Sequence, residues 1–249
     1  MNAADLADLT EAQSAEEVWA LHVAKMAEFG FDRLLYGYTR IQRPNALGSP
    51  EDHFILSNHD SEFIKEFLGN HLYYHAPMVR WSLQNDGACS WSWVTEQLEN
   101  GRLSPEELKV VEFNKKMEAN AGYSISFKNV SHRSQGGMGL TARRGITQKE
   151  VDDMWAERGR EISALCNVVH LKLTNLPYIG HRTLTKRQRE ALEWAGGGKT
   201  MADIALIMGL TPATVEKHLR LARKALDVDT TTQAVLKASF QNQIFVLEN

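Results

Sequence analysis

The chain contains few cysteines, and their scarcity excludes two ways of stabilising a fold. Cys89 and Cys166 are the only two among 249 residues, and both stand in apolar surroundings. Neither belongs to a cluster with the spacing of metal ligands, which excludes a cysteine-based zinc site. Isolated cysteines of this kind are typical of free thiols in a reducing compartment. We therefore expect no disulfide.

Long apolar runs are also missing. No stretch approaches the roughly 18 apolar residues of a membrane helix. The N-terminus, MNAADLADLTEAQ, is acidic and lacks the basic-then-apolar pattern of a secretory signal. These absences predict a cytoplasmic protein with no membrane partner.

Motifs that carry catalysis are absent as well. The sequence has no Gly-x-Ser-x-Gly elbow and no dinucleotide-binding fingerprint. The run Gly196–Thr200 has the composition of a phosphate loop, but it lacks the required spacing and preceding strand. His71 and His75 stand four residues apart without a third ligand at suitable spacing. We predict no enzymatic activity, no catalytic residue, no metal and no cofactor.

Charge is distributed unevenly along the chain. The net charge of −3 on its own argues against a nucleic-acid partner. However, residues 175–249 contain 10 Lys/Arg and 7 Asp/Glu, whereas the rest of the chain contains 18 Lys/Arg and 24 Asp/Glu. The basic part is therefore the one that phosphate groups would attract.

Residues 183–244 within this basic part divide into four short helical segments. Thr185-x-x-Gln188 forms a capping box, and the following glycines end the first helix. Thr200 begins the second helix, Gly209 and Leu210 form a tight turn, and Thr211-Pro212 opens the third. Two helices joined by a short glycine-containing turn are typical of a helix-turn-helix.

The helical spacing separates a core from an outer face. We expect the core to contain Ile204, Ala205, Ile207, Met208, Val215, Leu219, Ala222 and Leu226. The third helix carries Thr214, Glu216, Lys217, His218, Arg220, Arg223 and Lys224 away from this core. Such a face suits the major groove of DNA. Charge alone would favour a solvated surface, but the preceding helix, the glycine turn and the following helix from Thr230 to Ile244 favour DNA.

This region resembles the C-terminal domain of LuxR-type transcription regulators, a tetrahelical helix-turn-helix. The matching residues are Leu184-Thr185, Arg187, Leu192, Gly198-Lys199-Thr200, Ile204-Ala205, Gly209, Thr214-Val215, His218-Leu219, Lys224, Leu226 and Thr232-Gln233-Ala234-Val235. The family usually has glutamate where this chain has Gln188, and glutamine still completes the capping box.

The first part of the chain alternates helical and extended patterns. We predict helices over 14–29, 61–68, 77–83, 104–121 and 147–173, strands over 31–41, 53–56, 123–130 and 138–143, loops at 43–50 and 131–137, and a loop or strand at 89–94. This order predicts an α+β fold, an N-terminal α-β-α sandwich with an antiparallel sheet, followed by the all-α tetrahelical domain. The predicted boundaries are 1–174, a linker over 175–182, and 183–249.

The order of elements is similar to the N-terminal autoinducer-binding domain of the same family. The similarity rests on Gly30-Phe31, Phe63 with Phe67, Pro77-x-Val79, Trp91, Gly122 and Gly136-Gly137-Met138-Gly139. It implies that the domain dimerises and that a pocket between sheet and helices encloses an N-acyl-homoserine lactone, which we expect to be long-chain.

The resemblance also implies roles for single residues. Trp91 matches a tryptophan near the lactone. Phe63 stands where the family usually has a tryptophan that bonds the lactone carbonyl, and phenylalanine cannot make that bond. Ala76 stands where an aspartate usually accepts the ligand amide. Ala142 lies near a usual serine or threonine, with Thr141 adjacent. The full predicted ligand set is Tyr36, Tyr38, His59, Phe63, Phe67, Ala76, Met78, Val79, Trp91, Phe127, Met138, Thr141 and Ala142. For each aromatic residue taken alone, a place in the core is favoured, and it is the resemblance of the whole domain that favours a ligand pocket.

For DNA, the resemblance implies a homodimer on a palindromic operator, with RNA polymerase as a further partner. We predict base contacts from Lys217 and Arg220, supported by Thr214 and Glu216. We predict phosphate contacts from Lys199, Thr200, His218, Arg223 and Lys224, and place Thr211 in the same surface. We expect the helix from Thr230, through Ala234, Val235 and Ala238, to pair the two DNA-binding domains.

Two classes of alternative remain open. The chain could be an orphan regulator that senses another small molecule or none. The first domain could instead be an acylase or lactonase, which would need a nucleophile or metal, or a dimerisation module, which would enclose no cavity.

Overall fold

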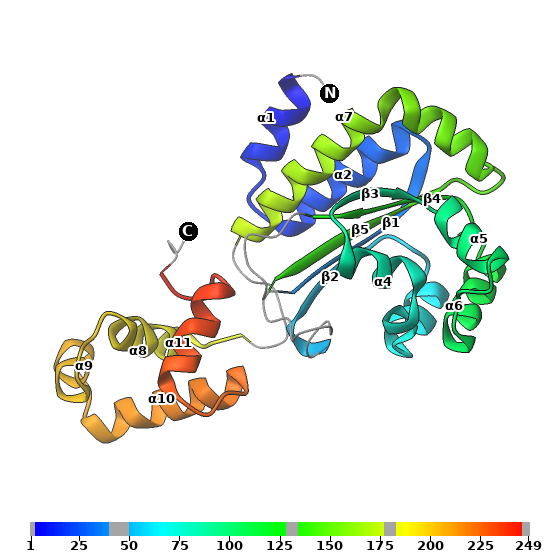
Figure 1. Ribbon diagram of the computed structural model, residues 1–249. Coiled ribbons are helices and arrows are strands. Elements are labelled where there is room, and N and C mark those ends of the chain that lie inside the picture. The colour runs from blue at the N-terminus through cyan, green and yellow to red at the C-terminus, as the bar shows by residue number, and fades with distance from the viewer. Residues whose placement is uncertain (1–2, 40–49, 128–133, 177–182, 246–249) are drawn as a thin grey trace. The chain divides into compact units, whose positions relative to one another are not determined.

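The computed structural model describes residues 3–39, 50–127, 134–176 and 183–245, and the chain divides into two compact units, Met1–Thr174 and Asn175–Asn249 (Figure 1). Most of the predicted linker and of the predicted loop over 43–50 lies outside these residues, as do positions 131–133 of the second loop. Across the described ranges, no helix is long and apolar enough to cross a membrane.

The first unit contains a five-stranded antiparallel sheet with the order β2-β1-β5-β4-β3. The strands are β1 (Phe31–Thr39), β2 (His53–Ser57), β3 (Gly87–Ser90), β4 (Gly122–Ser126) and β5 (Gln135–Ala142). The last strand in the chain therefore lies at the centre of the sheet, between β1 and β4.

Helices cover both faces of this sheet, which confirms the predicted α-β-α sandwich (Figure 1). On one face lie α2 (Ala15–Glu28) and α7 (Gln148–Asn175), and α1 (Ala3–Glu11) is tied to α2 by an ion pair between Asp5 and Lys25. The other face is covered by short elements: α3 (Ser61–Ile64), the π-helical turn η2 (Lys65–Gly69), the 3-10 turn η3 (Leu72–His75), α4 (Pro77–Gln84), α5 (Ser92–Glu99) and α6 (Pro105–Lys116). A 3-10 turn, η1 (Pro50–Asp52), precedes β2.

Several predicted elements differ from the observed ones. The helix expected to reach residue 121 ends at Lys116, because Glu118 turns the chain with a φ of 51° and Gly122 already belongs to β4. The stretch 89–94 is expected to be a loop or strand, but β3 ends at Ser90 and helix α5 begins at Ser92. At this junction Ser92 N donates a hydrogen bond to Ser90 Oγ. Helix α1 was not predicted.

Strand alternation gives the two sheet faces different contents. The face toward α2 and α7 carries large side chains: Tyr36 and Phe127 lie against His170 of α7, with ring centroids 5.9 and 4.1 Å from its ring. The opposite face carries glycine at Gly37, Gly137 and Gly139. One face is therefore packed as a core, and the other leaves space above the strands.

The second unit consists of the four predicted helices: α8 (Lys186–Gly196), α9 (Met201–Met208), α10 (Pro212–Leu226) and α11 (Thr231–Phe240). Gln188 Oε1 accepts from Thr185 N at 2.9 Å, so glutamine does complete the capping box. Gly209 adopts a φ of 65° in the turn between α9 and α10, a conformation that glycine enters at little cost.

Two packing predictions for this unit are wrong. Ile207 is 44% exposed, because the buried stripe of α9 runs through Ile204, Ala205 and Met208 and turns Ile207 outward. Ala234 and Ala238 are 0% exposed within the domain's own core. These two side chains therefore cannot contact a second domain, whereas Val235 of the same helix is half-buried, and pairing of two domains through this helix stays a prediction.

Candidate ligand cavity and DNA-binding surface

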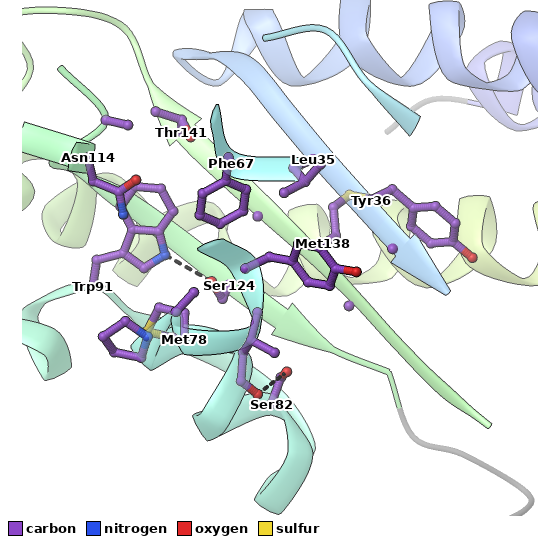
Figure 2. A pocket seen from close by; sticks show the side chains of 18 of the residues that line it. Leu35, Tyr36, Phe67, Met78, Ser82, Trp91, Asn114, Ser124, Met138 and Thr141 are labelled. Atoms are coloured by element: carbon purple, nitrogen blue, oxygen red, sulfur yellow. Dashed lines mark hydrogen bonds between the residues drawn. The ribbon is translucent and has the colours of Figure 1, made fainter. Parts of the chain in front are cut away.

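A cavity of about 410 Å³ lies over the glycine-bearing face of the sheet (Figure 2). A Cβ added to Gly37 would meet no atom within 4 Å, and one added to Gly139 would meet only atoms at 3.9 Å or more. The space exists because the strands place no side chain there. Residues from η2, η3, α4, α5 and α6 close it from above.

The cavity brings together most of the predicted ligand residues. Its lining includes Tyr36, Tyr38, His59, Phe63, Phe67, Ala76, Met78, Val79, Trp91, Met138 and Thr141. Three of them border it through the strands rather than through their side chains. The hydroxyl of Tyr36 forms a hydrogen bond with His170 Nδ1 at 2.9 Å, and the ring centroid of Tyr38 lies 5.2 Å from that of His170. Met138 Sδ lies 3.1 Å from His22 Nε2.

Phe127 and Ala142 do not line the cavity, and this corrects their prediction. The ring of Phe127 stacks on His170. Ala142, 3% exposed, pairs with Phe31 on the face toward α7. Because side chains alternate along a strand, an assignment wrong by one residue places a side chain on the opposite face. Thr141, the neighbour of Ala142, is the residue that faces the cavity.

The cavity also includes polar residues that the sequence did not indicate: His53, Ser82, Asn114, Lys115, Asn120, Ser124 and Gln135. The alternation of β4 would have identified Ser124, since it lies two residues from Gly122, which contacts Trp91. The helical and loop residues carried no comparable signal, because their direction depends on how α4 and α6 pack.

Hydrogen bonds fix the polar side chains around the cavity. Trp91 Nε1 donates to Ser124 Oγ at 2.9 Å (Figure 2). The ring of His59 stacks on Phe63 with centroids 4.0 Å apart, and its Nε2 lies 3.5 Å from Thr141 Oγ1. The ring of Phe63 has no hydrogen-bonding atom, but His59 places a ring nitrogen beside it.

Burial determines the protonation of His59. Burial and, to a smaller extent, the positive charge of Arg33 lower the pKa of His59 from 6.5 to about 4. The imidazole is therefore neutral near pH 7 and offers one donor and one acceptor.

This protonation predicts a pH-dependent stability. The unfolded chain binds a proton at His59 below about pH 6.5, whereas the folded state does so only below about pH 4. Stability should fall as the pH drops through this window, by about 2 kcal/mol between pH 7 and pH 5 from His59 alone. Urea unfolding of the first domain at pH 7 and pH 5 measures this loss of unfolding free energy. In His59→Gln the loss should be smaller than in the unaltered protein by about 2 kcal/mol. An identical pH dependence in both proteins would contradict the assignment.

The second unit presents the predicted DNA surface along α10. Glu216, Lys217, Arg220 and Lys224 are exposed on this helix, while Val215, Leu219, Ala222 and Leu226 are buried. Lys217 and Arg220 stand three residues apart and so share one face of the helix. Their contact with DNA remains a prediction.

Other predicted DNA residues are engaged within the protein. Arg223 donates to Glu216 Oε1 and to Thr231 Oγ1, each at 2.9 Å, and so ties α10 to α11. Thr200 caps α9 through Asp203, and Thr211 caps α10 by accepting from Thr214 N. These side chains position the helices, which leaves Lys217, Arg220 and Lys224 as the cations extending from α10.

Comparisons with known proteins follow the same division. A family model described as the autoinducer binding domain matches residues 14–173, and one described as sigma-70 region 4 matches residues 181–226. The transcriptional activator AnoR of Acinetobacter nosocomialis is 25% identical over 237 residues, which are 91% of each chain.

Solved structures show the same fold. SdiA of Escherichia coli matches with a TM-score of 0.51 and 17% identity, covering 98% of this chain and 96% of that one. SdiA in complex with octanoyl-rac-glycerol matches with a TM-score of 0.52 and 17% identity, covering 95% of this chain and 92% of that one. CepR2 of Burkholderia cenocepacia, described as an N-acylhomoserine lactone-dependent factor, matches with a TM-score of 0.53 and 17% identity, covering 68% of this chain and 92% of that one.

The family models thus match the unit that holds the cavity and the unit that holds the helix-turn-helix. The similar proteins are transcription regulators and not enzymes. The chain belongs to the LuxR-type transcription regulators, with an autoinducer-binding domain followed by a DNA-binding helix-turn-helix.

Proposed function

We propose that this regulator binds a long-chain N-acyl-homoserine lactone in the cavity and, as a homodimer, a palindromic operator. The observation that carries this proposal is the glycine-floored cavity of about 410 Å³ within the domain that matches the autoinducer-binding family. CepR2 depends on such a lactone and SdiA holds an octanoyl ester, which supports an acyl ligand here.

The shape of the cavity supports a long acyl chain. Its lining follows β5 from Gln135 to Thr141. Six residue steps along a strand correspond to about 20 Å. Leu35, Ile55 and Leu68 add apolar surface, so an extended chain could lie along the sheet with its head group toward Trp91 and Thr141.

The proposed response couples ligand to DNA through population shift. A ligand that stabilises one arrangement of the dimer raises the fraction that can bind two half-sites about one helical turn apart. Lys217 and Arg220 would read bases, Lys224 and Lys199 would contact phosphates, and RNA polymerase would be the further partner.

Thermal unfolding against N-acyl-homoserine lactones of increasing chain length tests the proposal. A ligand that binds only the folded state, present at about 100 times its Kd, should add roughly 2.7 kcal/mol. We expect the largest rise in Tm for chains long enough to follow β5. A flat response across the series, in folded protein free of bound ligand, would contradict lactone binding.

A further inference from the structure

The polar lining of the cavity consists of neutral groups and one lysine, and it contains no carboxylate among the described residues. Of the described residues that line it, none is Asp or Glu, and Lys115 is the one Lys or Arg. A ligand N–H therefore meets no carboxylate from this part of the chain. Any acceptor for it has to be a neutral oxygen or nitrogen.

The neutral oxygens of Ser82, at one end of the cavity, are already in use. The carbonyl oxygen of Ser82 accepts from Ser126 Oγ at 2.9 Å and from Gln135 Nε2 at 2.7 Å, and two bonds fill its two lone pairs. Ser82 Oγ itself donates to Val79 O at 2.8 Å. At this end of the cavity, the protein satisfies its own polar groups.

The other end offers donors. Ser124 Oγ accepts from Trp91 Nε1 at 2.9 Å, so its own O–H can point toward a ligand. Asn114 and Lys115, from the end of α6, add amide and ammonium N–H groups to the lining. Figure 2 shows Trp91, Ser124 and Asn114 on the same side of the cavity as Thr141. This group favours oxygen atoms that accept, such as those of carbonyls and esters.

We propose that the cavity recognises the head group of its ligand through acceptor atoms and requires no amide N–H, so that it binds an acyl ester about as tightly as the matching acyl amide. This inference rests on the proposed function of the cavity as an acyl-ligand site. The ligand class is thereby widened from acylated amines to acylated alcohols.

The size of the expected effect follows from hydrogen bonding. A hydrogen bond to a charged acceptor would favour the amide by about 10- to 150-fold over an ester that lacks the N–H. A neutral acceptor, such as the side-chain oxygen of Asn114 or Asn120, would favour the amide by only about 2- to 12-fold, and an amide N–H buried unpaired loses affinity. We expect Kd values for the two compounds within about tenfold, or a lower Kd for the ester.

A matched pair of compounds tests this inference on the full-length protein. N-acyl-homoserine lactones with 8 to 14 carbons are compared by calorimetry with α-acyloxy-γ-butyrolactones of the same length, in which oxygen replaces the amide N–H. Ester binding within tenfold of the amide, or tighter, supports the inference. Amide binding tighter by tenfold or more overturns it and leaves the proposed function intact, whereas a failure of both series overturns both.

Ala76 offers a gain-of-selectivity variant. It lines the cavity, is 5% exposed, and is the N-cap residue of α4 with no side-chain cap. Aspartate is favoured at an N-cap, so Ala76→Asp adds a carboxylate where the backbone accepts one. It should create an amide preference of tenfold or more, and the neutral Ala76→Asn should create less. An unchanged ratio in folded Ala76→Asp would overturn the role given to the missing carboxylate; if that variant fails to fold, the wild-type comparison still decides.

Discussion

Replacing Gly37 with phenylalanine should strongly weaken ligand binding and leave the fold intact. Gly37 lies in β1, in the cavity floor, and an added side chain would enter open space. The phenylalanine ring would then occupy volume that the acyl chain needs. Because overpacking a site costs about 1–3 kcal/mol, we expect affinity to fall about 5- to 150-fold in calorimetry with the lactone that gives the largest Tm rise.

A graded series provides the control for this variant. Gly37→Ala adds a single methyl group and should weaken binding far less than Gly37→Phe. In the absence of ligand, both variants should keep the Tm of the unaltered protein within a few degrees, because no atom lies within 4 Å of the added Cβ. An unchanged Kd in folded Gly37→Phe would show that the ligand binds elsewhere.

Replacing Arg220 with alanine should remove operator preference without unfolding the helix-turn-helix. Arg220 is exposed on α10, while the same helix buries Val215 and Leu219 in the domain core. A bidentate contact from arginine to guanine contributes about 1–3 kcal/mol of discrimination. Binding to the operator should fall about 10- to 100-fold, and binding to unrelated DNA should change little.

Lys224→Ala is the matched comparison, since it removes a cation from the same helix at a position predicted to contact phosphate. It should weaken binding to all sequences similarly and lower the salt dependence by about one unit of slope. Fluorescence anisotropy at several salt concentrations separates the two effects. Retained specificity in Arg220→Ala would remove this residue from the base-reading set.

The sequence alone was sufficient where local signals agree. The DNA-binding unit follows from caps, glycine turns and apolar spacing, each of which acts within a few residues, and all four helices appear as predicted. Its errors, at Ile207, Ala234 and Ala238, concern which side of a helix faces the core. A spacing of three or four residues permits two neighbouring stripes, and packing against the other helices selects one of them.

The cavity shows a different balance between local and tertiary information. Its aromatic residues and glycines are visible in the sequence, and Phe63, Phe67 and Trp91 do line it. However, the sequence could not establish that Thr141 faces the cavity while Ala142 and Phe127 face away. Strand phase depends on the register of β5 between β1 and β4, and the pairing with β1 joins residues about 100 positions apart, such as Gly37 and Gly137.

Local sequence signals therefore establish the two-domain order, the helix-turn-helix and the apolar character of the first domain, because caps, turns and periodicity act within a few residues. The position of the cavity depends on tertiary packing. Sheet pairing brings Gly37, Gly137 and Gly139 together to form the cavity floor. The packing of α6 beside this floor places the donor of Asn114 at the cavity, which no local pattern indicates, whereas the position of Ser124 follows from the alternation of β4.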